Sequence, residues 1–441
     1  VNAFADTNNV KKLVLPARLA EIKDVQGFLS SFRNLSELKV TGTFENRVYA
    51  TLDENDGGKN TAGMLTNADK DTLLYCPIGI NKDNVENFEV EIPSKITKIA
   101  AHAFDADSDS YKGILKTYYN ITKITFHANI VSIGEAAFYK AVNLKEAVFK
   151  AARMSVGMEI SDEAFYDSGL ETVVFEENGT WNSGSYTATT SCGVITIGES
   201  AFAKTNLKEV NLPNSVRNVG KEAFAYNSAL NKIDFARVAS DLAFGDYAFR
   251  SCSSLINVEL TANVGYMAFN SVFYGCNKLK GLKVAKDNPN YTQDAQGVVY
   301  NKDITEIAYY PDGYEGEYVM PETLTSLGGA VFKDKESLTA IVISKNIVSI
   351  GDSAFEGCIN LSKVTFEAGG TDSLTIGARA FYNCESLVAI ELPARTVSIG
   401  EECFKYYQTN IRRLSYVTLN EGLKTIGEAA FFYTSNLVQI N

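Results

Sequence analysis

The hexapeptide Ile350-Gly351-Asp352-Ser353-Ala354-Phe355 is one copy of a block, Ile-Gly-x-x-Ala-Phe, that recurs along the chain. Intact copies also end at Phe138, Phe202, Phe381 and Phe431, and relaxed copies end at Phe104, Phe165, Phe224, Phe249, Phe273, Phe332 and Phe404. Where nothing is inserted, successive phenylalanines lie 22 to 27 residues apart. A fixed period in this range predicts a solenoid of stacked repeats, an architecture that usually serves binding.

A strand pattern precedes each block. Before Phe355 the chain reads Leu338-x-x-Ile341-x-Ile343, and apolar residues two apart indicate a strand with one buried face. The glycine of the block suits a positive φ or a close approach of two backbones. The small Ala and bulky Phe that follow favour a short helical turn packed against the strands. The predicted fold is therefore an α/β solenoid, with a parallel β-sheet on one face and short helical turns or irregular segments on the other.

Two long interruptions of the period resemble each other. Strand patterns flank turns at Asn67-Ala68-Asp69-Lys70 and Asn301-Lys302-Asp303, and the second strands end at Pro77 and Pro311. Both interruptions are predicted to be inserted β-hairpins. We therefore expect residues 1–285 to form a solenoid with a hairpin insertion near 60–95. Residues 286–320 are expected to form the second hairpin, and residues 321–441 to continue the same solenoid.

Two further insertions, at residues 105–120 and 176–192, are predicted to be loops. The second holds the only tryptophan, Trp181, among glycine, serine and tyrosine, a composition that resembles a contact loop. The alternative is that Trp181 only fixes this loop to the solenoid.

Composition excludes several classes of protein. The chain has 441 residues, 45% hydrophobic and 21% charged, which is typical of a folded protein. A net charge of −12 and the absence of a dense basic run argue against nucleic acid. No apolar stretch reaches the roughly 18 residues that a membrane-spanning helix needs. The chain begins at Val1 without a leader, so we expect a trimmed export segment, which leaves room for lipid anchoring at the missing end.

Cysteine occupies one slot of the repeat, three residues after the phenylalanine. Other copies place Ala141, Ser168, Thr205 or Asn227 there, and the cysteines in this slot are Cys252, Cys276, Cys358 and Cys384. The slot therefore selects a small buried group, and a packed free thiol is the first interpretation. A disulfide between stacked residues such as Cys252 and Cys276 stays open, and so does a metal site, although no CxxC occurs.

No arrangement of residues points to catalysis, and no cofactor is expected. The only histidines, His102 and His127, lie beside repeat core positions, and no nucleophile is paired with them in the sequence. One weak metal candidate stands out, because Asp105, Asp107 and Asp109 alternate as in a calcium loop. Ser110 stands where such a loop has glycine, and Lys116 where it has glutamate, so an ordinary solvated loop is the alternative.

The repeat resembles a known family. The order Leu207, Val210, Leu212-Pro213, Val216, Val219-Gly220 and Ala223-Phe224 is similar to the BspA-like leucine-rich repeats of bacterial cell surfaces and some protists. The resemblance covers nearly the whole chain. It implies an exported, non-enzymatic protein at the cell surface or outer membrane. Such proteins are associated with attachment to host matrix proteins and to other cells.

The strand residues that point away from the core are the candidates for binding. Their mixed charge favours a broad contact with a protein from the host matrix or another cell surface, and a solvated face is the alternative. The candidate binding residues are Glu209, Asn211, Lys232, Asp234, Asn257, Glu259, Lys363, Thr365, Glu391 and Trp181.

Two other functions stay open. Tyrosines crowd the second hairpin and favour a glycan-binding surface; they are Tyr291, Tyr300, Tyr309, Tyr310, Tyr314 and Tyr318. The last repeat stops within its strand at Ile440, which is compatible with a spacer that presents another domain.

Overall fold

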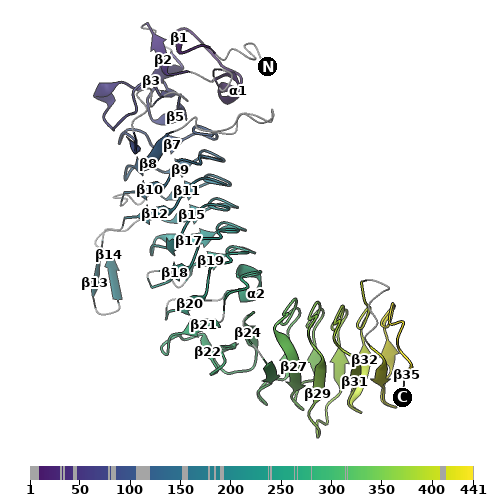
Figure 1. Ribbon diagram of the computed structural model, residues 1–441. Helices are drawn as coiled ribbons and strands as arrows, with labels where there is room; N and C mark the ends of the chain where they lie inside the picture. Colours follow the sequence, from purple (N-terminus) through teal and green to yellow (C-terminus); the bar gives the residue numbers. More distant parts are fainter. Residues whose placement is uncertain are drawn as a thin grey trace. The chain divides into compact units, whose positions relative to one another are not determined.

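The computed structural model describes residues 9–440 except 30–31, 33–34, 43–46, 78–79, 81–85, 106–119, 151–156, 177–178, 183–184, 189–192, 237, 239–240, 263, 266, 280, 313, 315 and 408–413. The chain forms two compact units, Val1–Leu255 with Asn263–Cys276 and Ile256–Ala262 with Asn277–Asn441. Each unit is a β-solenoid whose rungs are drawn one after another in Figure 1. The segment boundaries predicted from the sequence stay predictions.

The Leu-x-x-Val-x-Leu pattern forms a first strand row. Its members pair in parallel within several short sheets, and in one of them Ile124, Ala147 and Val173 lie side by side. In the first unit the row consists of β1 (Lys12–Pro16), β2 (Glu37–Thr41), β6 (Phe88–Glu91), β8 (Ile121–Phe126), β10 (Glu146–Phe149), β12 (Thr172–Phe175), β16 (Glu209–Asn211) and β18 (Lys232–Asp234). In the second unit it consists of β20 (Asn257–Leu260), β21 (Gly281–Val284), β25 (Gly316–Val319), β27 (Leu338–Ile343), β29 (Lys363–Phe366), β31 (Ala389–Glu391), β33 (Tyr416–Thr418) and β35 (Gln439–Ile440).

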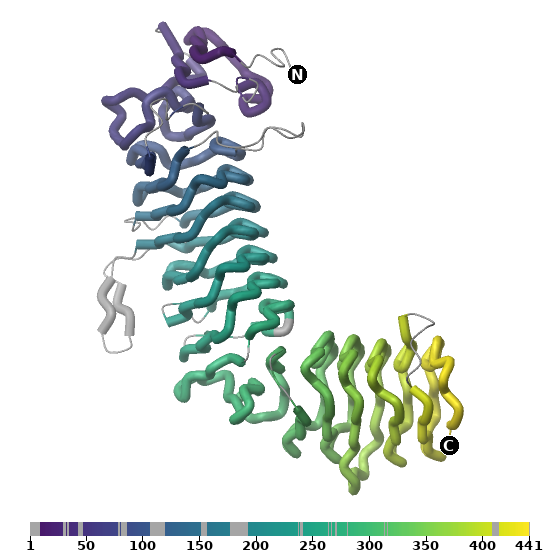
Figure 2. Tube along the Cα trace, viewed as in Figure 1, coloured from purple at the N-terminus to yellow at the C-terminus, as the bar shows by residue number. Residues whose placement is uncertain are grey.

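The residues that lead into each Ile-Gly pair form a second strand row, also parallel. In the first unit it runs through β7 (Lys98–Ile99), β9 (Ser132–Ile133), β11 (Met158–Ile160), β15 (Ile195–Ile197), β17 (Val216–Val219) and β19 (Ala243–Phe244). In the second unit it runs through β26 (Ser326–Leu327), β28 (Ser349–Ile350), β30 (Leu374–Ile376), β32 (Thr396–Ile399) and β34 (Thr425–Ile426). Figure 2 shows successive rungs stacked one after another within each unit.

Both predicted hairpins are present, and each has a third strand that the sequence did not predict. In the first unit β3 (Tyr49–Thr51), β4 (Leu65–Asn67) and β5 (Thr72–Tyr75) are antiparallel, and β5 continues into the second strand row. In the second unit β22 (Tyr291–Gln293), β23 (Val299–Asn301) and β24 (Ile307–Tyr309) repeat the arrangement.

The expectation of a loop at residues 176–192 is wrong in part. Two strands, β13 (Gly179–Asn182) and β14 (Ser185–Ala188), pair there as an antiparallel hairpin. The polar alternation of Thr180, Trp181, Tyr186 and Thr187 is a strand signal, but the surrounding glycine and serine concealed it.

The turns of the intact Ile-Gly-x-x-Ala-Phe copies are not helical, which corrects the predicted α/β class. Helix in the described residues is confined to α1 (Val25–Leu29), α2 (Phe269–Val272) and the 3-10 turn η1 (Glu54–Asp56). Ser353 in the block and Gly357 two residues after it have φ of 56° and 74°, and left-handed residues at this spacing interrupt any α-helix. The backbone amides of Ser353 and Phe355 instead donate to Ala378 and Ala380 of the next rung, at 2.8 and 2.7 Å.

The glycine of the block permits close packing of successive rungs. A Cβ on Gly400 would lie 2.3 Å from the backbone carbon of Gly377, and one on Gly351 would lie 2.7 Å from the nitrogen of Gly329. Neither glycine has a positive φ. The left-handed residue of the block stands two positions later, as at Glu402. Of the two roles that the sequence allowed, close approach is the one observed.

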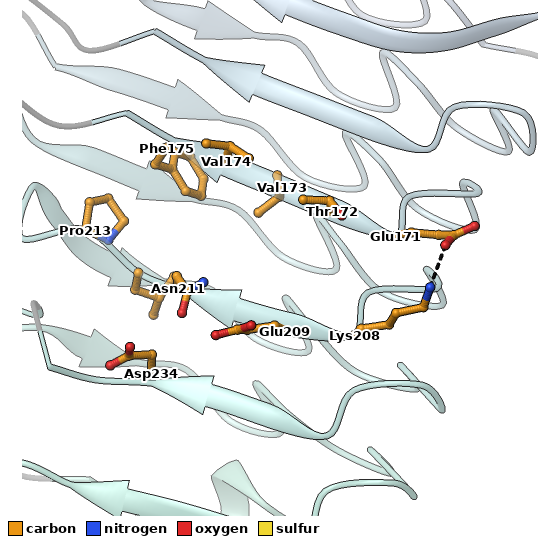
Figure 3. A pocket seen from close by; sticks show the side chains of 11 residues that line it. Glu171, Thr172, Val173, Val174, Phe175, Lys208, Glu209, Asn211, Pro213 and Asp234 are labelled. Atoms are coloured by element: carbon orange, nitrogen blue, oxygen red, sulfur yellow. Dashed lines mark hydrogen bonds and ion pairs between the residues drawn. The ribbon is translucent and has the colours of Figure 1, made fainter. Parts of the chain in front are cut away.

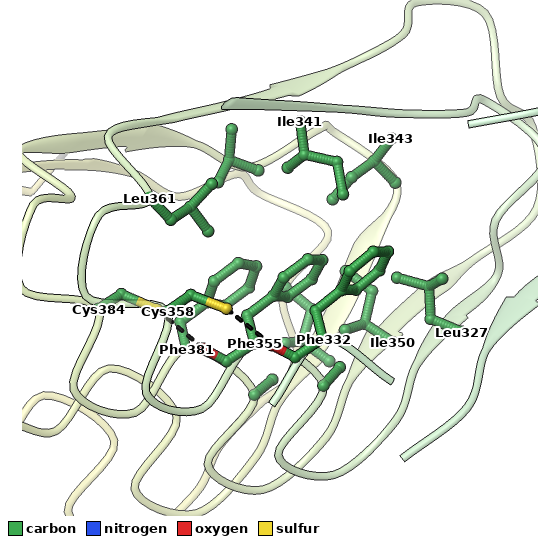
Figure 4. Packing of buried hydrophobic residues seen from close by; sticks show 14 of the residues in the cluster. Leu327, Phe332, Ile341, Ile343, Ile350, Phe355, Cys358, Leu361, Phe381 and Cys384 are labelled. Carbon is green, nitrogen blue, oxygen red and sulfur yellow. Dashed lines mark hydrogen bonds between the residues drawn. The ribbon is translucent and has the colours of Figure 1, made fainter. Parts of the chain in front are cut away.

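The core of each unit is a column of stacked phenylalanine rings. In the second unit Phe332, Phe355 and Phe381 are buried, with Ile341 and Leu361 packed above them (Figure 4). In the first unit the column passes through Phe104, Phe138, Phe165, Phe202, Phe224, Phe249 and Phe273. The block therefore forms architecture, and candidate sites lie on the residues outside it.

Candidate functional site

The predicted binding residues alternate with buried ones along the first strand row. Val210 is buried between Glu209 and Asn211, and Val258 is buried between Asn257 and Glu259. Lys232, Lys363, Thr365 and Glu391 are exposed, and Asp234 is half-buried. The structure therefore places these side chains away from the core, as the alternation predicts, and their role in binding stays a prediction.

Ion pairs between neighbouring strands connect much of this surface. Lys283 contacts Glu259 at 3.1 Å, and Lys232 contacts its register partner Glu209. Other pairs in the row are Lys12–Glu37, Lys123–Glu146 and Lys363–Glu317. Exposed ion pairs contribute about 0–1 kcal/mol each to stability. Their main effect here is on the charge pattern of the exposed face. Because of these pairs, positive and negative side chains lie next to each other along the exposed face.

The first strand row opens between β12 and β16, which are consecutive in the row but belong to different hydrogen-bonded sheets. A cavity of about 330 Å³ lies in this opening. Figure 3 shows side chains of both strands around it, with the ion pair between Glu171 and Lys208 (2.7 Å) at one end. The residues that line it are Glu171, Thr172, Val173, Val174, Phe175, Lys208, Glu209, Asn211, Leu212, Pro213 and Asp234.

This cavity brings together three of the residues singled out from the sequence, namely Glu209, Asn211 and Asp234. Sequence reasoning missed Phe175, which is half-buried and stacks on Phe149 with ring centroids 5.0 Å apart. It also missed the opening itself. The one available signal was the insertion that begins directly after β12, because extra chain at that point changes how the next rung is placed.

A second surface feature, the turn ridge, lies on the turns of the first unit. Tyrosines and cations of successive rungs contact one another there; they are Tyr139, Lys140, Tyr166, Lys204, Tyr226, Tyr247, Arg250 and Tyr274. Tyr139 and Tyr166 stack at 5.4 Å, and the Tyr166 hydroxyl beside Lys204 raises the pKa of that ammonium. The signal that was overlooked is the recurrence of tyrosine within two residues of the repeat phenylalanine.

The cysteines of the repeat slot are free and buried, and they take part in hydrogen bonds between rungs. The Cys358 thiol donates to the carbonyl oxygen of Phe332 at 2.9 Å, and the Cys384 thiol to that of Phe355 at 3.2 Å (Figure 4). Burial raises the pKa of the Cys358 thiol to about 12, so this sulfur stays protonated and unreactive in the folded protein.

The calcium candidate is only partly described. Asp105 accepts a contact from His102 Nδ1 at 2.9 Å, while Asp107 and Asp109 lie outside the described residues. In the described part of the chain, no group of three or more His, Cys, Asp or Glu side chains is arranged to hold a metal ion. Trp181 pairs with Tyr186 in the β13–β14 hairpin, and its side chain lies outside what the structure describes.

Five of the six tyrosines of the second hairpin are buried, and Tyr314 is half-buried against them. Tyr300, Tyr310 and Tyr318 are each at most 2% exposed, and the hydroxyls of Tyr300 and Tyr318 lie 2.7 Å apart. Buried rings cannot form a platform for sugars, so the tyrosine density gives no support to glycan binding at this hairpin.

The family follows from these features. A family model described as BspA type leucine rich repeat region, with 6 copies, matches residues 81–190, 181–296 and 325–441. The chain therefore belongs to the BspA-type leucine-rich repeat family, as the Ile-Gly-x-x-Ala-Phe block indicated. The family and fold are those of non-enzymatic repeat proteins.

Two solved structures share the fold. One is a leucine-rich cell surface protein from Faecalibacterium prausnitzii, 18% identical, with a TM-score of 0.54, over 91% of this chain and 94% of that one. The other is the pneumococcal vaccine antigen PcpA, 19% identical, with a TM-score of 0.54, over 92% of this chain and 87% of that one. No curated protein matches the sequence. Over the described residues, every helix is too short to cross a membrane.

Proposed function

We propose that this chain is an exported recognition protein that attaches to a protein of the host matrix or of another cell surface through its first strand row. The observation that carries the proposal is the exposed face of that row, where buried valines and isoleucines alternate with charged and amide side chains over both units. A face of mixed charge suits a broad protein contact. The surface location named for the F. prausnitzii protein supports an extracellular setting.

The proposal includes the absence of enzymatic activity. The cysteines that the structure describes are buried, and the described His102 contacts the Asp105 carboxylate instead of a nucleophile. In the part of the exposed row that the structure describes, no base, nucleophile and stabilised anion site come together at one place.

Binding of the purified chain to immobilised matrix proteins, mucins and bacterial cells tests this function. The variant to compare carries four substitutions on the first strand row: Asn211→Ala, Lys232→Ala, Lys363→Ala and Glu391→Ala. Its matched control carries four exposed changes of the same types near the second row: Asn218→Ala, Lys221→Ala, Lys424→Ala and Glu401→Ala. Circular dichroism first establishes that both variants are folded.

We expect the first-row variant to lose binding by about tenfold or more, because several contacts of the proposed interface are removed together. The control is expected to bind like the unmodified chain. Equal binding by both variants, or an equal loss in both, contradicts the use of the first strand row.

Glycan binding is a second candidate, and the turn ridge is the feature that favours it. Tyr226 and Tyr274 are 37% and 38% exposed, and Arg250 stacks against both rings. Aromatic rings beside cations suit an acidic sugar. A glycan array probed with the chain and with Tyr226→Ala tests it: signals that are unchanged by the substitution refute this use of the ridge.

A further inference from the structure

Two strand edges face each other across the opening in the first strand row. β12 is the last strand of the sheet β6–β8–β10–β12, and β16 is the first strand of the sheet β16–β18. A strand edge carries a row of amide and carbonyl groups that accept another strand. Here two such edges lie on either side of one cavity.

The backbone of β12 uses every second residue to bond its neighbour β10. The amide of Thr172 donates to Lys145 at 3.1 Å, and that of Glu176 donates to Phe149 at 2.9 Å. Because amide and carbonyl groups alternate between the two sides of a parallel strand, those of Val173 and Phe175 point toward β16. By the same alternation, Glu209 and Asn211 of β16 present their backbone groups toward β12, since Val210 pairs toward Ile233 of β18.

The opening is closed at the end where the strands begin. The amide of Asn206 donates to Leu170 at 2.8 Å, but the next bond, from Lys208 to Glu171, is already stretched to 3.5 Å. Beyond it no backbone bond joins the described residues of β12 to those of β16. The described backbone bonds between the two strands therefore stop near their amino ends, and their carboxyl ends are left unpaired with each other.

The lining specifies the chemistry of an occupant. Three carboxylates and one ammonium line the cavity. Glu171 pairs with Lys208 and Lys145, and Glu209 pairs with Lys232, so that among the described residues Asp234 is the lining carboxylate outside these ion pairs. Apolar surface is added at the open end by Phe175 and Pro213. The volume of about 330 Å³ is near the lower limit of ligand pockets, which suits a few residues of an extended segment.

We infer that the opening between β12 and β16 binds an extended segment of a partner protein, which enters as an added strand between the two edges. Its backbone bonds to the groups of Val173, Phe175, Glu209 and Asn211. A basic side chain of the segment lies at Asp234, beside the ion pair of Glu209 with Lys232, and an apolar one lies against Phe175. The inference rests on the proposed function as a protein-binding surface and assigns one contact of that surface.

Hydrogen exchange of the free chain, read at single-residue resolution, tests the open edges without a ligand. The amides of Val173, Phe175, Glu209 and Asn211 are expected to exchange at least about tenfold faster than those of Ala147 and Val148 in β10, which is paired on both sides. Equal protection would show that the row is closed in solution and would overturn the inference.

Peptide binding tests the occupant. A library of random peptides displayed on phage is selected against the unmodified chain, and the enriched peptides are then measured against Asn211→Pro. Proline removes the amide that faces the opening and is tolerated at a strand edge. The matched change Val148→Pro removes an amide that the ladder uses and is expected to destabilise the fold, whereas Asn211→Pro is expected to stay folded.

The expected peptides are basic and rich in β-branched residues, and they lose binding by at least about tenfold to Asn211→Pro and to Glu209→Lys. The control Glu259→Lys breaks an equivalent ion pair, with Lys283 in the paired strands β20 and β21, and is expected to bind as before. A selection that yields only peptides indifferent to Asn211→Pro overturns the inference. Self-association of the chain that Asn211→Pro abolishes also overturns it, because the occupant is then a second copy.

The two proposals fail separately. Capture of such peptides without binding to any matrix, mucin or cell-surface component refutes the proposed function alone. Attachment that is equally strong in Asn211→Pro and Glu209→Lys refutes the strand addition alone.

Discussion

The ring of Phe332 stacks on the ring of Phe355 with centroids 5.0 Å apart and planes within 2° of parallel. Phe355 is in turn 4.9 Å from Phe381, and all three rings are fully or almost fully buried. Each ring is therefore covered by the rungs on both sides, so the packing of one repeat depends on its two neighbours.

Substitution of Phe355 by alanine is expected to lower the free energy of unfolding by about 3–5 kcal/mol, because it leaves a cavity between two rings that cannot close together. Chemical denaturation of the purified variant measures the loss. Phe355→Leu is the control and is expected to cost less, since it keeps most of the volume. A loss below about 1 kcal/mol for the alanine variant would contradict the stacked column.

Gly400→Ala is expected to destabilise the second unit by about 1–3 kcal/mol, since the new Cβ would lie 2.3 Å from the Gly377 backbone. Gly328→Ala is a matched control, because no atom lies within 4 Å of its Cβ position and its φ is not positive. Thermal melting of both variants measures the difference. Similar melting temperatures for the two would show that close approach of rungs does not require the glycine.

The Cys358 thiol makes the stability depend on pH in the alkaline range. Its pKa is about 12 in the folded chain against 9.0 for an ordinary thiol. Below pH 9 both states keep the proton and the contribution is fully present. Between pH 9 and 12 only the unfolded state loses it, so stability falls by about 1.4 kcal/mol per pH unit from this group.

Denaturation of the unmodified chain and of Cys358→Ser at pH 8 and pH 10.5 isolates this effect, because serine does not titrate there. The unmodified chain is expected to lose more stability between the two values. Parallel losses in both proteins would mean that the thiol is already accessible to solvent, which labelling with iodoacetamide would detect independently.

Asn227 links two rungs in the slot that cysteine fills elsewhere. It is fully buried, its Nδ2 donates to Phe202 at 2.9 Å and to Phe224 at 2.8 Å, and its Oδ1 accepts from Thr205. Asn227→Ala is expected to cost about 1–3 kcal/mol, since buried carbonyls lose a donor. Asn227→Cys is expected to cost less, because the Cys252 thiol donates to Phe224 from the next rung. Equal costs in urea denaturation would refute a shared role of the slot.

The sequence predicts the fold at positions where a residue pattern is compatible with only one structure. Phenylalanine in the block can only be core, and the alternation around Val210 can only be a half-buried strand. The turn was mispredicted because Ala354-Phe355 is compatible with a helix in isolation. Bonds to the next rung decide its conformation, and residues such as Ala378 lie too far along the chain for a local pattern to show them.

The candidate site was less predictable for the same reason. Outward residues such as Glu209 and Asp234 follow from alternation, but whether two consecutive strands stay paired depends on the register of whole rungs. The tyrosines near Tyr300 illustrate the opposite error, because a dense aromatic composition is shared by binding platforms and by cores. Burial, which the sequence does not give, separates the two.

The hydrogen bonds that the turns send from rung to rung, such as that from Phe355 to Ala380, have a mechanical consequence. These bonds and those of both strand rows run along the stacking direction within a unit, so tension applied along that direction loads them rung by rung. A rung that unfolds under tension lengthens the chain while its neighbours stay folded, so that the unit is expected to unfold one rung at a time. We therefore expect a unit pulled along its stack to lengthen before all of its rungs have unfolded.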